Sequence, residues 1–185
     1  MHPRRKDRQG APPTVLRAEP VARSRLFTIE RLDVRFGNGR EVEFERLRGG
    51  SAVLVVPLRG DSLILVREYA AGLERYELGF PKGRIEPGEA PEAAAAREVR
   101  EEIGHAARRF TYLKKLSTSP GYSDLATHVI LAEDLHPDPA AGDEPEELEV
   151  IEWPLADMAG LLAREEFSDA RSVAALFFLA QRGFR

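Results

Sequence analysis

Three glutamates in one short segment, Glu98, Glu101 and Glu102, are the residues of this sequence best suited to chemistry. At about 100° per residue they fall within one arc of a helix. Glu98 and Glu102 are like charges four positions apart, which weakens a helix by roughly a few tenths of a kcal/mol. A hard divalent cation with oxygen ligands would offset that repulsion. The alternative is a solvated acidic face with Arg97 and Arg100 as neighbours, and the helix alone leaves both interpretations open.

The segment around these glutamates carries the signals of a helix with clear ends. Pro91 suits the first turn, where its missing N–H costs nothing, and four alanines follow it. Gly104 supplies a C-terminal stop. An apolar stripe lies opposite the acidic face and consists of Ala95, Ala96, Val99 and Ile103. The sequence therefore predicts a helix that packs on a core and presents its carboxylates on the other side.

The loop before this helix favours a phosphate-related function. Gly83 and Gly88 bracket a tight, polar turn that leads to the helix N-terminus, where backbone N–H groups attract anions. From Gly83 there are five residues to Glu89, then seven more, then Arg-Glu-Val-Arg-Glu-Glu-Ile-Gly ending at Gly104. This pattern resembles the Nudix hydrolase box at every defined position except the last. There His105 replaces an apolar residue, beyond the helix end.

Strands surround the helical segments on both sides, which indicates an α/β protein with a mixed sheet between helices. The resemblance implies the Nudix α/β/α sandwich. Residues 26–47 alternate with period two around a Gly37-Asn38-Gly39 turn, which predicts an additional N-terminal antiparallel β-hairpin. We therefore expect a flexible basic tail over 1–20, a hairpin over 21–48 that serves dimerisation and substrate binding, and a Nudix domain over 49–185.

Composition excludes several other classes of protein. The chain has 185 residues, 43% apolar and 31% charged, and is long enough for one domain with a sizeable core. It contains no cysteine, so a disulfide framework, a thiol nucleophile and a thiolate metal site are excluded. The longest apolar run, 173–180, is too short to span a bilayer, and no apolar stretch follows the basic N-terminus as in a signal peptide. We expect a cytoplasmic enzyme with no membrane partner.

The net charge of −4 is unevenly distributed, with +5 in residues 1–26 and −9 in the rest. A basic tail can bind nucleic acid, but this one has no interleaved aromatic residues and is mixed with Pro and Gly, which favours a disordered extension. The acidic remainder would repel the phosphates of a nucleic acid. A nucleic-acid partner, or an RNA-end pyrophosphatase activity, is therefore not expected.

The resemblance extends beyond the box to a group of Nudix enzymes that hydrolyse ADP-linked compounds, next to the ADP-ribose pyrophosphatases. ADP-ribose pyrophosphatases usually have a basic residue where this chain has Ala70, and they lack Gly79-Phe80. The resemblance implies hydrolysis of the pyrophosphate linkage in ADP-ribose, diadenosine triphosphate or NADH, with release of AMP. The alternative is a catalytically weak Nudix-fold sensor of a nucleotide or of ADP-ribose, against which three clustered carboxylates argue. The segments that carry this resemblance are 21–27, 67–70, 76–80 and 142–146.

A pyrophosphate linkage repels an attacking water, and a divalent cation relieves that repulsion and lowers the pKa of a bound water. Glu98 and Glu102 are the expected primary ligands of Mg²⁺, with Mn²⁺ as a possible substitute, and Glu101 is the expected third. By resemblance, the backbone carbonyl of Lys82 is a further ligand. We expect Arg97 to pair with Glu101 and to hold the carboxylates in place.

A carboxylate bound to a metal is a weak base, because the cation favours its charged form. A separate carboxylate on a mobile loop would accept the proton of the attacking water better. Residues 142–147, Gly-Asp-Glu-Pro-Glu-Glu, offer such a group, and related ADP-ribose pyrophosphatases use a glutamate of the matching loop. We therefore expect Glu144, ahead of Glu146, to be the general base, while a solvated acidic loop is the alternative.

The remaining candidates are substrate-binding residues, each with a structural alternative. Arg67 and Lys82 could grip phosphates or form salt bridges at a strand edge. Tyr69 and Tyr76, and Tyr122 with them, could stack on adenine or pack against the protein. The resemblance implies a homodimer that exchanges its N-terminal hairpins, in which Arg25, with Arg23, reaches the nucleotide of the partner subunit.

Overall fold

The computed structural model describes residues 11–142 and 144–184, in two compact units that we consider separately. The first unit extends to Gly49 and includes Ser119–Leu125, and the second consists of Gly50–Thr118 and the chain from Ala126 onward. The first ten residues of the predicted tail and Asp143 of the acidic loop lie outside the described residues.

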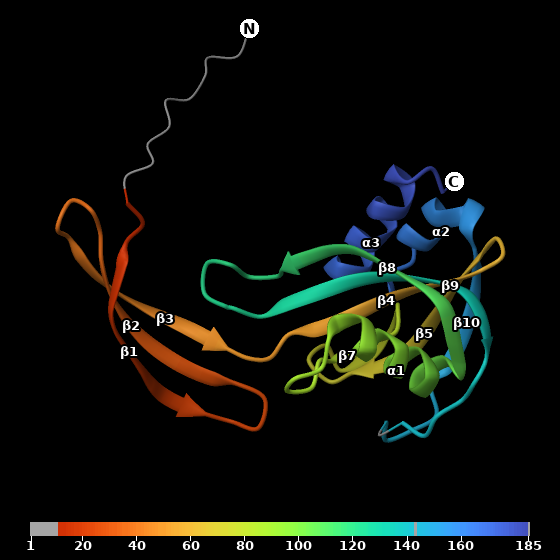
Figure 1. The fold of residues 1–185 in the computed structure, drawn as a ribbon, viewed down its shortest axis with the longest axis horizontal. Helices are drawn as coiled ribbons and strands as arrows, with labels where there is room; N and C mark the ends of the chain where they lie inside the picture. Colours follow the sequence, from red (N-terminus) through yellow and green to blue (C-terminus); the bar gives the residue numbers. More distant parts are fainter. Residues whose placement is uncertain (1–10, 143, 185) are drawn as a thin grey trace, which may run out of the picture. The chain divides into compact units, whose positions relative to one another are not determined.

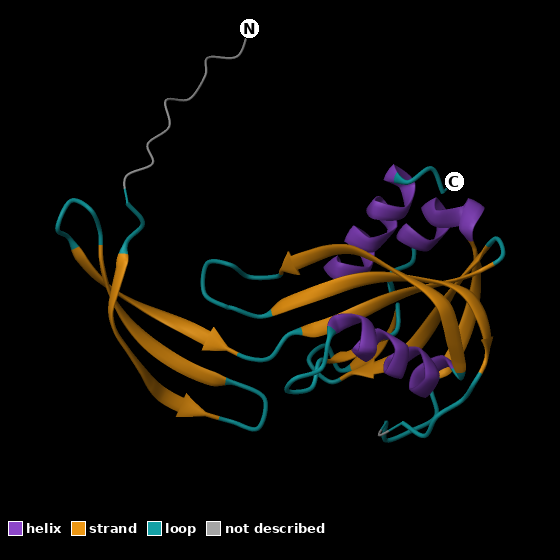
Figure 2. Cartoon of the chain, viewed as in Figure 1, coloured by secondary structure: helices purple, strands orange, loops and turns teal. Residues whose placement is uncertain are grey.

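The first unit is an antiparallel sheet of three strands in the order β1-β2-β3 (Figure 2). Its strands are β1 (Thr14–Arg23), β2 (Thr28–Arg35) and β3 (Glu41–Arg48). The predicted hairpin is confirmed as β2 and β3, with Arg35 opposite Glu41. Gly39 in the turn has a φ of 80°, a conformation that glycine adopts without strain.

The tail prediction is wrong from Thr14 onward, because β1 occupies residues that were assigned to it. This strand pairs with β2 along its length, with register shifts on either side of Arg17–Pro20, and Glu19 forms an ion pair with Arg31 of β2. Its Pro and Arg residues are untypical of a strand. The strand forms because the neighbouring strand β2, and not local preference, supplies its hydrogen-bond partners. The ribbon therefore has three strands instead of two.

The second unit contains a seven-stranded mixed sheet with helices on both faces (Figure 1). The strand order is β10-β5-β4-β9-β8, with β6 paired to β5 and β7 to β4, and only β4 and β9 are parallel. The strands are β4 (Ala52–Arg59), β5 (Ser62–Ala70), β6 (Arg75–Gly79), β7 (Lys82–Arg84), β8 (His105–Ser117), β9 (Ala126–Pro137) and β10 (Glu149–Pro154). The helices are α1 (Pro91–Ile103), α2 (Met158–Leu162), which follows a 3₁₀ turn over Leu155–Asp157, and α3 (Ala170–Gln181).

The two faces of the central strand β4 supply two separate cores. Val53 and Val55 pack with buried apolar residues of α1, whereas Leu54 and Val56 pack with residues of α2 and α3. All four are fully buried, as expected for a central strand covered on both sides. This alternation confirms the predicted α/β/α sandwich.

Helix α1 has the predicted ends. Pro91 occupies the first turn, and Gly104 ends the helix with a φ of 68° while its N–H donates to the carbonyl of Val99. Ala94, Ala95, Val99 and Ile103 join the core beneath the helix, so the predicted stripe was wrong in including Ala96, which is only partly buried, in place of Ala94. Another side of α1, which carries Arg97 and Glu98, contacts β7 and the loop that follows it.

Candidate active site

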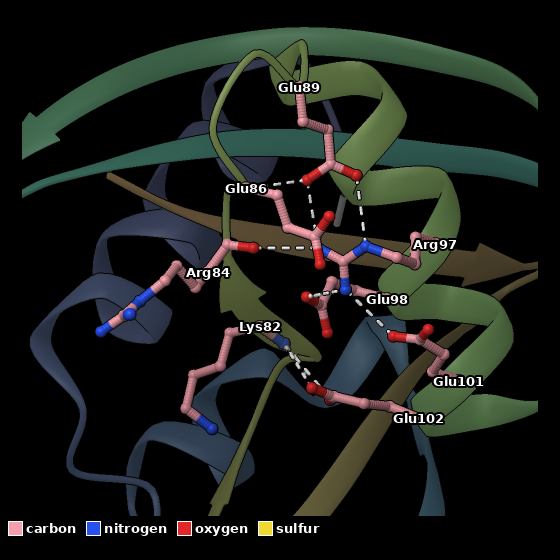
Figure 3. Close-up of polar contacts among 8 residues, drawn as sticks. All are labelled: Lys82, Arg84, Glu86, Glu89, Arg97, Glu98, Glu101 and Glu102. Atoms are coloured by element: carbon pink, nitrogen blue, oxygen red, sulfur yellow. Dashed lines mark hydrogen bonds and ion pairs between the residues drawn. The ribbon is translucent and has the colours of Figure 1, made fainter. Parts of the chain in front are cut away.

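Two glutamates of α1 are buried against the short strand β7 (Figure 3). Glu98 is 6% exposed and Glu102 is 8% exposed, which is rare for glutamate unless it has a partner. The backbone of Gly83 passes directly over the Glu98 carboxylate, and a Cβ atom at this position would meet Glu98 Oε1 at 1.9 Å. Glycine at this position of the motif therefore allows the close approach that buries Glu98.

Glu102 accepts a hydrogen bond from the Lys82 backbone N–H, at 3.3 Å and 3.2 Å to its two oxygens. Burial, with smaller contributions from the charges of Glu98 and Glu68, raises the pKa of Glu102 to about 9 despite the lowering effect of Lys82. Burial also raises the pKa of Glu98, against the lowering effect of Arg97. The two adjacent buried carboxylates can therefore both be ionised at neutral pH only when additional positive charge lies close to them.

Arg97 connects the loop to the helix through a network of hydrogen bonds (Figure 3). Its guanidinium donates to Glu98 at 2.7 Å and to Glu101 at 3.0 Å, so the predicted pairing of Arg97 with Glu101 is confirmed. It also donates to Glu89 at 3.2 Å and to the Arg84 carbonyl at 2.9 Å. The hydrogen bond with Glu89, ahead of the other contacts, raises the pKa of Arg97. Arg97 therefore remains charged and fixes the carboxylates relative to the loop.

The chemistry of these side chains fits a hard divalent cation. The groups around β7 are carboxylate oxygens and backbone, which are ligands that Mg²⁺ and Mn²⁺ prefer. Within residues 11–142 and 144–184, no three acidic or histidine side chains already converge closely enough to hold a metal ion. Arg97 instead bridges Glu98 and Glu101. The buried Glu98 and Glu102, with the Lys82 backbone beside them, are the groups whose unbalanced charge suits a cation.

The acidic loop shares a cavity with the box. This cavity has a volume of about 430 Å³, and Glu144 and Glu146 line it together with Glu101 and Glu102. The loop passes close to the helix at Gly142, where an added Cβ would lie 3.5 Å from the Cβ of Glu101. The structure therefore brings both predicted base candidates to the helix end that carries the predicted ligands.

A second cavity, of about 580 Å³, contains Lys82 and Tyr69 on its walls. The Lys82 ammonium forms an ion pair with Glu68. Tyr69 and Tyr76 pack edge to face with ring centres 5.5 Å apart, and both side chains are about half exposed. Tyr76 also donates a hydrogen bond to Glu146 at 2.9 Å, which raises the pKa of Tyr76. The two tyrosines thus form one aromatic surface at the β5–β6 edge.

The ion pairs of Arg67 involve residues that line neither of these two cavities. Arg67 forms ion pairs with Glu149 of β10 and, at 3.1 Å, with Glu166. Arg25 and Tyr122 belong to the first unit, so their predicted contacts with substrate stay predictions. Arg67 and Lys82 both adopt the salt-bridge arrangement that the sequence offered as the alternative to phosphate binding.

Glu68 is a residue of the site that the sequence analysis did not single out. It pairs with Lys82 and lines the second cavity. The period of the strand provides a signal for it, because Ile64 and Val66 of β5 pack with α1 and Glu68 is the next residue in that series.

Comparison with known proteins agrees with this geometry. A NUDIX domain model matches residues 49–176, and a model of the NudE-type Nudix hydrolase N-terminal domain matches residues 13–46. The chain therefore belongs to the Nudix hydrolase family. The second match includes most of β1, in agreement with the three-stranded unit.

Two relatives and one solved structure indicate the position of the chain within the family. It is 50% identical to the ADP compounds hydrolase NudE of Escherichia coli over 171 residues, which cover 91% of this chain and 92% of that protein. It is 33% identical to the ADP-ribose pyrophosphatase of Bacillus subtilis, over 89% of this chain and 93% of the relative. A crystal structure of an ADP compounds hydrolase superposes with a TM-score of 0.86 at 49% identity, covering 94% of this chain and 97% of the other.

No helix within residues 11–142 and 144–184 is long and apolar enough to cross a membrane.

Proposed function

We propose that this chain hydrolyses the pyrophosphate linkage of small ADP-containing compounds, namely ADP-ribose, diadenosine triphosphate and NADH, and releases AMP. The observation that carries the proposal is the buried pair Glu98 and Glu102, of which Glu98 lies against the backbone of Gly83 and Glu102 against that of Lys82. A pair of buried carboxylates is costly without a cation, and a bound cation is what pyrophosphate hydrolysis requires. The names of the relatives support the choice of ADP-linked substrates.

Glu98, Glu102 and Glu101 would hold Mg²⁺, with Mn²⁺ as a substitute, and the carbonyl of Lys82 would complete the protein's share of the ligands. When bound, the cation neutralises the phosphates and lowers the pKa of a coordinated water. The hydrogen bond from the Lys82 N–H to Glu102, which brings this backbone next to a proposed ligand, supports the role of Lys82. Arg97 would keep Glu98 and Glu101 oriented through the hydrogen bonds that it makes with both.

Glu144 is the proposed general base. It lines the same cavity as Glu101 and Glu102, yet it comes from a different segment of the chain. It would accept the proton of the attacking water as the bond between the two phosphates breaks and AMP leaves. The box carboxylates would be poor acceptors for that proton, because binding a cation favours their charged form.

The second cavity is the proposed location for the rest of the substrate. Tyr69 and Tyr76 would stack on the adenine, and Lys82 would contact a phosphate. Since Lys82 is paired with Glu68, a phosphate would have to replace that carboxylate as its partner. Arg67 would likewise have to leave Glu149 and Glu166 to reach a phosphate.

We also propose a homodimer that forms through the first unit and brings Arg25 to the substrate of the partner. A small ribbon needs a covered apolar face to be stable. The unit exposes several large apolar side chains, among them Val15, Val21, Phe27 and Phe44. A second copy of the same ribbon would cover them.

The direct test is to incubate the purified protein with each of the three compounds, with Mg²⁺ or Mn²⁺, and to follow the release of AMP. We expect AMP with at least one compound, and we expect EDTA to abolish its release. The three rates would also rank the substrates, and the two metals would rank the cofactors. Absence of AMP with all three compounds and both metals would refute the proposal.

A further inference from the structure

A side-chain contact between Tyr76 and Glu146 ties the acidic loop to the sheet. The Tyr76 hydroxyl lies 2.9 Å from Oε1 and 3.2 Å from Oε2 of Glu146. Seventy residues separate the two in sequence, so the bond joins β6 to a loop that is remote along the chain. Both side chains are exposed, so burial does not dictate that they meet.

Tyr76 lies on β6, whose pairing and side-chain contacts fix its position on the sheet. It is opposite Tyr69 in the register of β5 and β6, and the two rings pack at 5.5 Å. The next residue, Glu77, accepts hydrogen bonds from Ser168 at 2.7 Å and from Arg75 at 2.6 Å. The hydroxyl of Tyr76 is therefore presented from a fixed position.

The other end of the loop is fixed to the C-terminus of α1. The Asp138 N–H donates to the Gly104 carbonyl at 3.0 Å, and the Ala140 N–H donates to the Arg100 carbonyl at 3.0 Å. Arg100 also forms an ion pair with Asp138 at 2.9 Å. The loop thus has one attachment formed by α1 and another formed by Tyr76, and Glu144 lies between them.

Pro145 connects Glu144 stiffly to Glu146. Proline fixes its own φ near −65° and disfavours the helical conformation in the residue before it. A side chain that holds Glu146 in place therefore also restricts the backbone of Glu144. In this Glu-Pro-Glu sequence, Glu146 can therefore anchor the loop while Glu144 faces the cavity.

We propose that Tyr76 is a positioning residue and that Glu146 is its anchor, so that together they place Glu144 in the cavity beside Glu101 and Glu102. The proposal rests on the proposed function, because it assigns the base role to Glu144. Glu146 is the anchor in this assignment, because both its oxygens lie within hydrogen-bonding distance of the Tyr76 hydroxyl.

The test begins with Tyr76→Phe, which removes the hydroxyl and keeps the ring. We expect kcat to fall about three- to ten-fold, the effect of losing one hydrogen bond, while KM stays within two-fold because stacking is retained. Tyr112→Phe is the matched control. Its hydroxyl also makes an exposed side-chain hydrogen bond, with His128 at 3.0 Å, and it has no role in the site.

A double-mutant cycle tests whether Tyr76 acts through Glu146. Glu146→Ala and Tyr76→Phe should lower kcat by similar factors, and the double variant should be no worse than Glu146→Ala alone. Glu146→Gln should restore most of the activity, because its amide oxygen still accepts the hydrogen bond of Tyr76. Additive losses, or a loss in Glu146→Gln as large as in Glu144→Gln, would overturn the proposal.

Hydrogen exchange provides a readout that does not depend on activity. In Tyr76→Phe, peptides that cover residues 144–150 should exchange several-fold faster than in the wild type, and those of α3 should be unchanged. An inactive wild-type protein would refute the proposed function, and the exchange experiment would still show whether Tyr76 holds the loop. Wild-type exchange together with wild-type kcat in Tyr76→Phe would overturn the inference.

Discussion

The Glu98 carboxylate lies against the backbone of Gly83 so closely that a Cβ atom on Gly83 would meet its Oε1 at 1.9 Å. The contact joins the first residue of the sequence motif to its central glutamate. It explains why the motif begins with glycine, because a larger residue would displace the carboxylate that the motif is built to present.

The first prediction concerns this contact. Gly83→Ala should push Glu98 out of its buried position and lower metal-dependent activity by about 10- to 100-fold, the usual cost of disturbing the support of a metal ligand. Gly50→Ala is the control, because a Cβ there would be no closer than 3.9 Å to any other group. Metal titration of both variants would decide, and equal affinities would contradict the prediction.

The second prediction concerns stability without metal. Glu102→Gln replaces a buried carboxyl group, whose ionised form is disfavoured by burial and by Glu98, with a neutral amide of the same shape, so we expect an unchanged or slightly higher Tm in EDTA. In the wild type, added Mg²⁺ should raise the Tm by mass action, and in the variant that increase should be lost. Glu92→Gln, an exposed glutamate of the same helix, should keep it. A variant that Mg²⁺ still stabilises like the wild type would remove Glu102 from the ligand set.

The third prediction concerns the base. Glu144→Gln should lower kcat by about two to four orders of magnitude, the usual range for loss of a general base, and leave the metal affinity near that of the wild type. Glu147→Gln, from the same cavity wall, serves as the control. If Glu144→Gln and Glu146→Gln both kept full kcat, the base would have to be one of the box glutamates.

The fourth prediction concerns acid stability. Burial alone would raise the pKa of Asp169, but Arg171 and the hydrogen bonds from Arg171 and Ser172 outweigh it and hold the pKa below its usual value. Such a group stabilises the fold above its unfolded pKa of about 3.9, and this contribution is lost as the pH falls through the lower folded value.

Asp169→Asn keeps a capping oxygen for α3 but cannot titrate. The wild type should therefore be more stable than Asp169→Asn at pH 7, by about 1 kcal/mol, and the difference should shrink below about pH 4. Urea unfolding at pH 7, 5 and 3 measures it. A difference that stays constant across these pH values would contradict the assignment.

The fifth prediction concerns assembly. Phe44→Asp places a charge on the exposed apolar side of the first unit, where Phe44 is 41% exposed, and should convert a dimer into a monomer. Glu45→Asp on the same strand should leave the dimer intact. Sedimentation measures both, and a wild-type protein that is a fully active monomer would rule out the dimer.

Local signals were sufficient to predict the helix and its motif. Pro91, the alanines and Gly104 define α1 without reference to the rest of the chain, and the structure confirms those ends. Period-two alternation likewise revealed the β2–β3 hairpin. These features depend on neighbours in sequence, which is why a sequence displays them.

Features that depend on distant neighbours were missed or left open. β1 obtains its hydrogen bonds from β2, so its own residues 14–20 resembled a tail. The partners of Arg67 come from β10 and from Glu166, far along the chain. The burial of Glu98 exists only because β7 returns across α1 at Gly83. Each of these contacts depends on a second segment of the chain, so the first segment alone does not predict it.

The measurement that tests the central claim most directly is a Mg²⁺ titration of AMP release from ADP-ribose, in the wild type, Glu98→Gln and Glu92→Gln. The wild type and Glu92→Gln should release AMP with the same saturable dependence on Mg²⁺. Glu98→Gln should keep the fold and lose at least about 100-fold of that turnover, because the cation contributes several kcal/mol of charge stabilisation. Wild-type turnover in Glu98→Gln would contradict the proposal that the buried glutamates of α1 hold the catalytic metal.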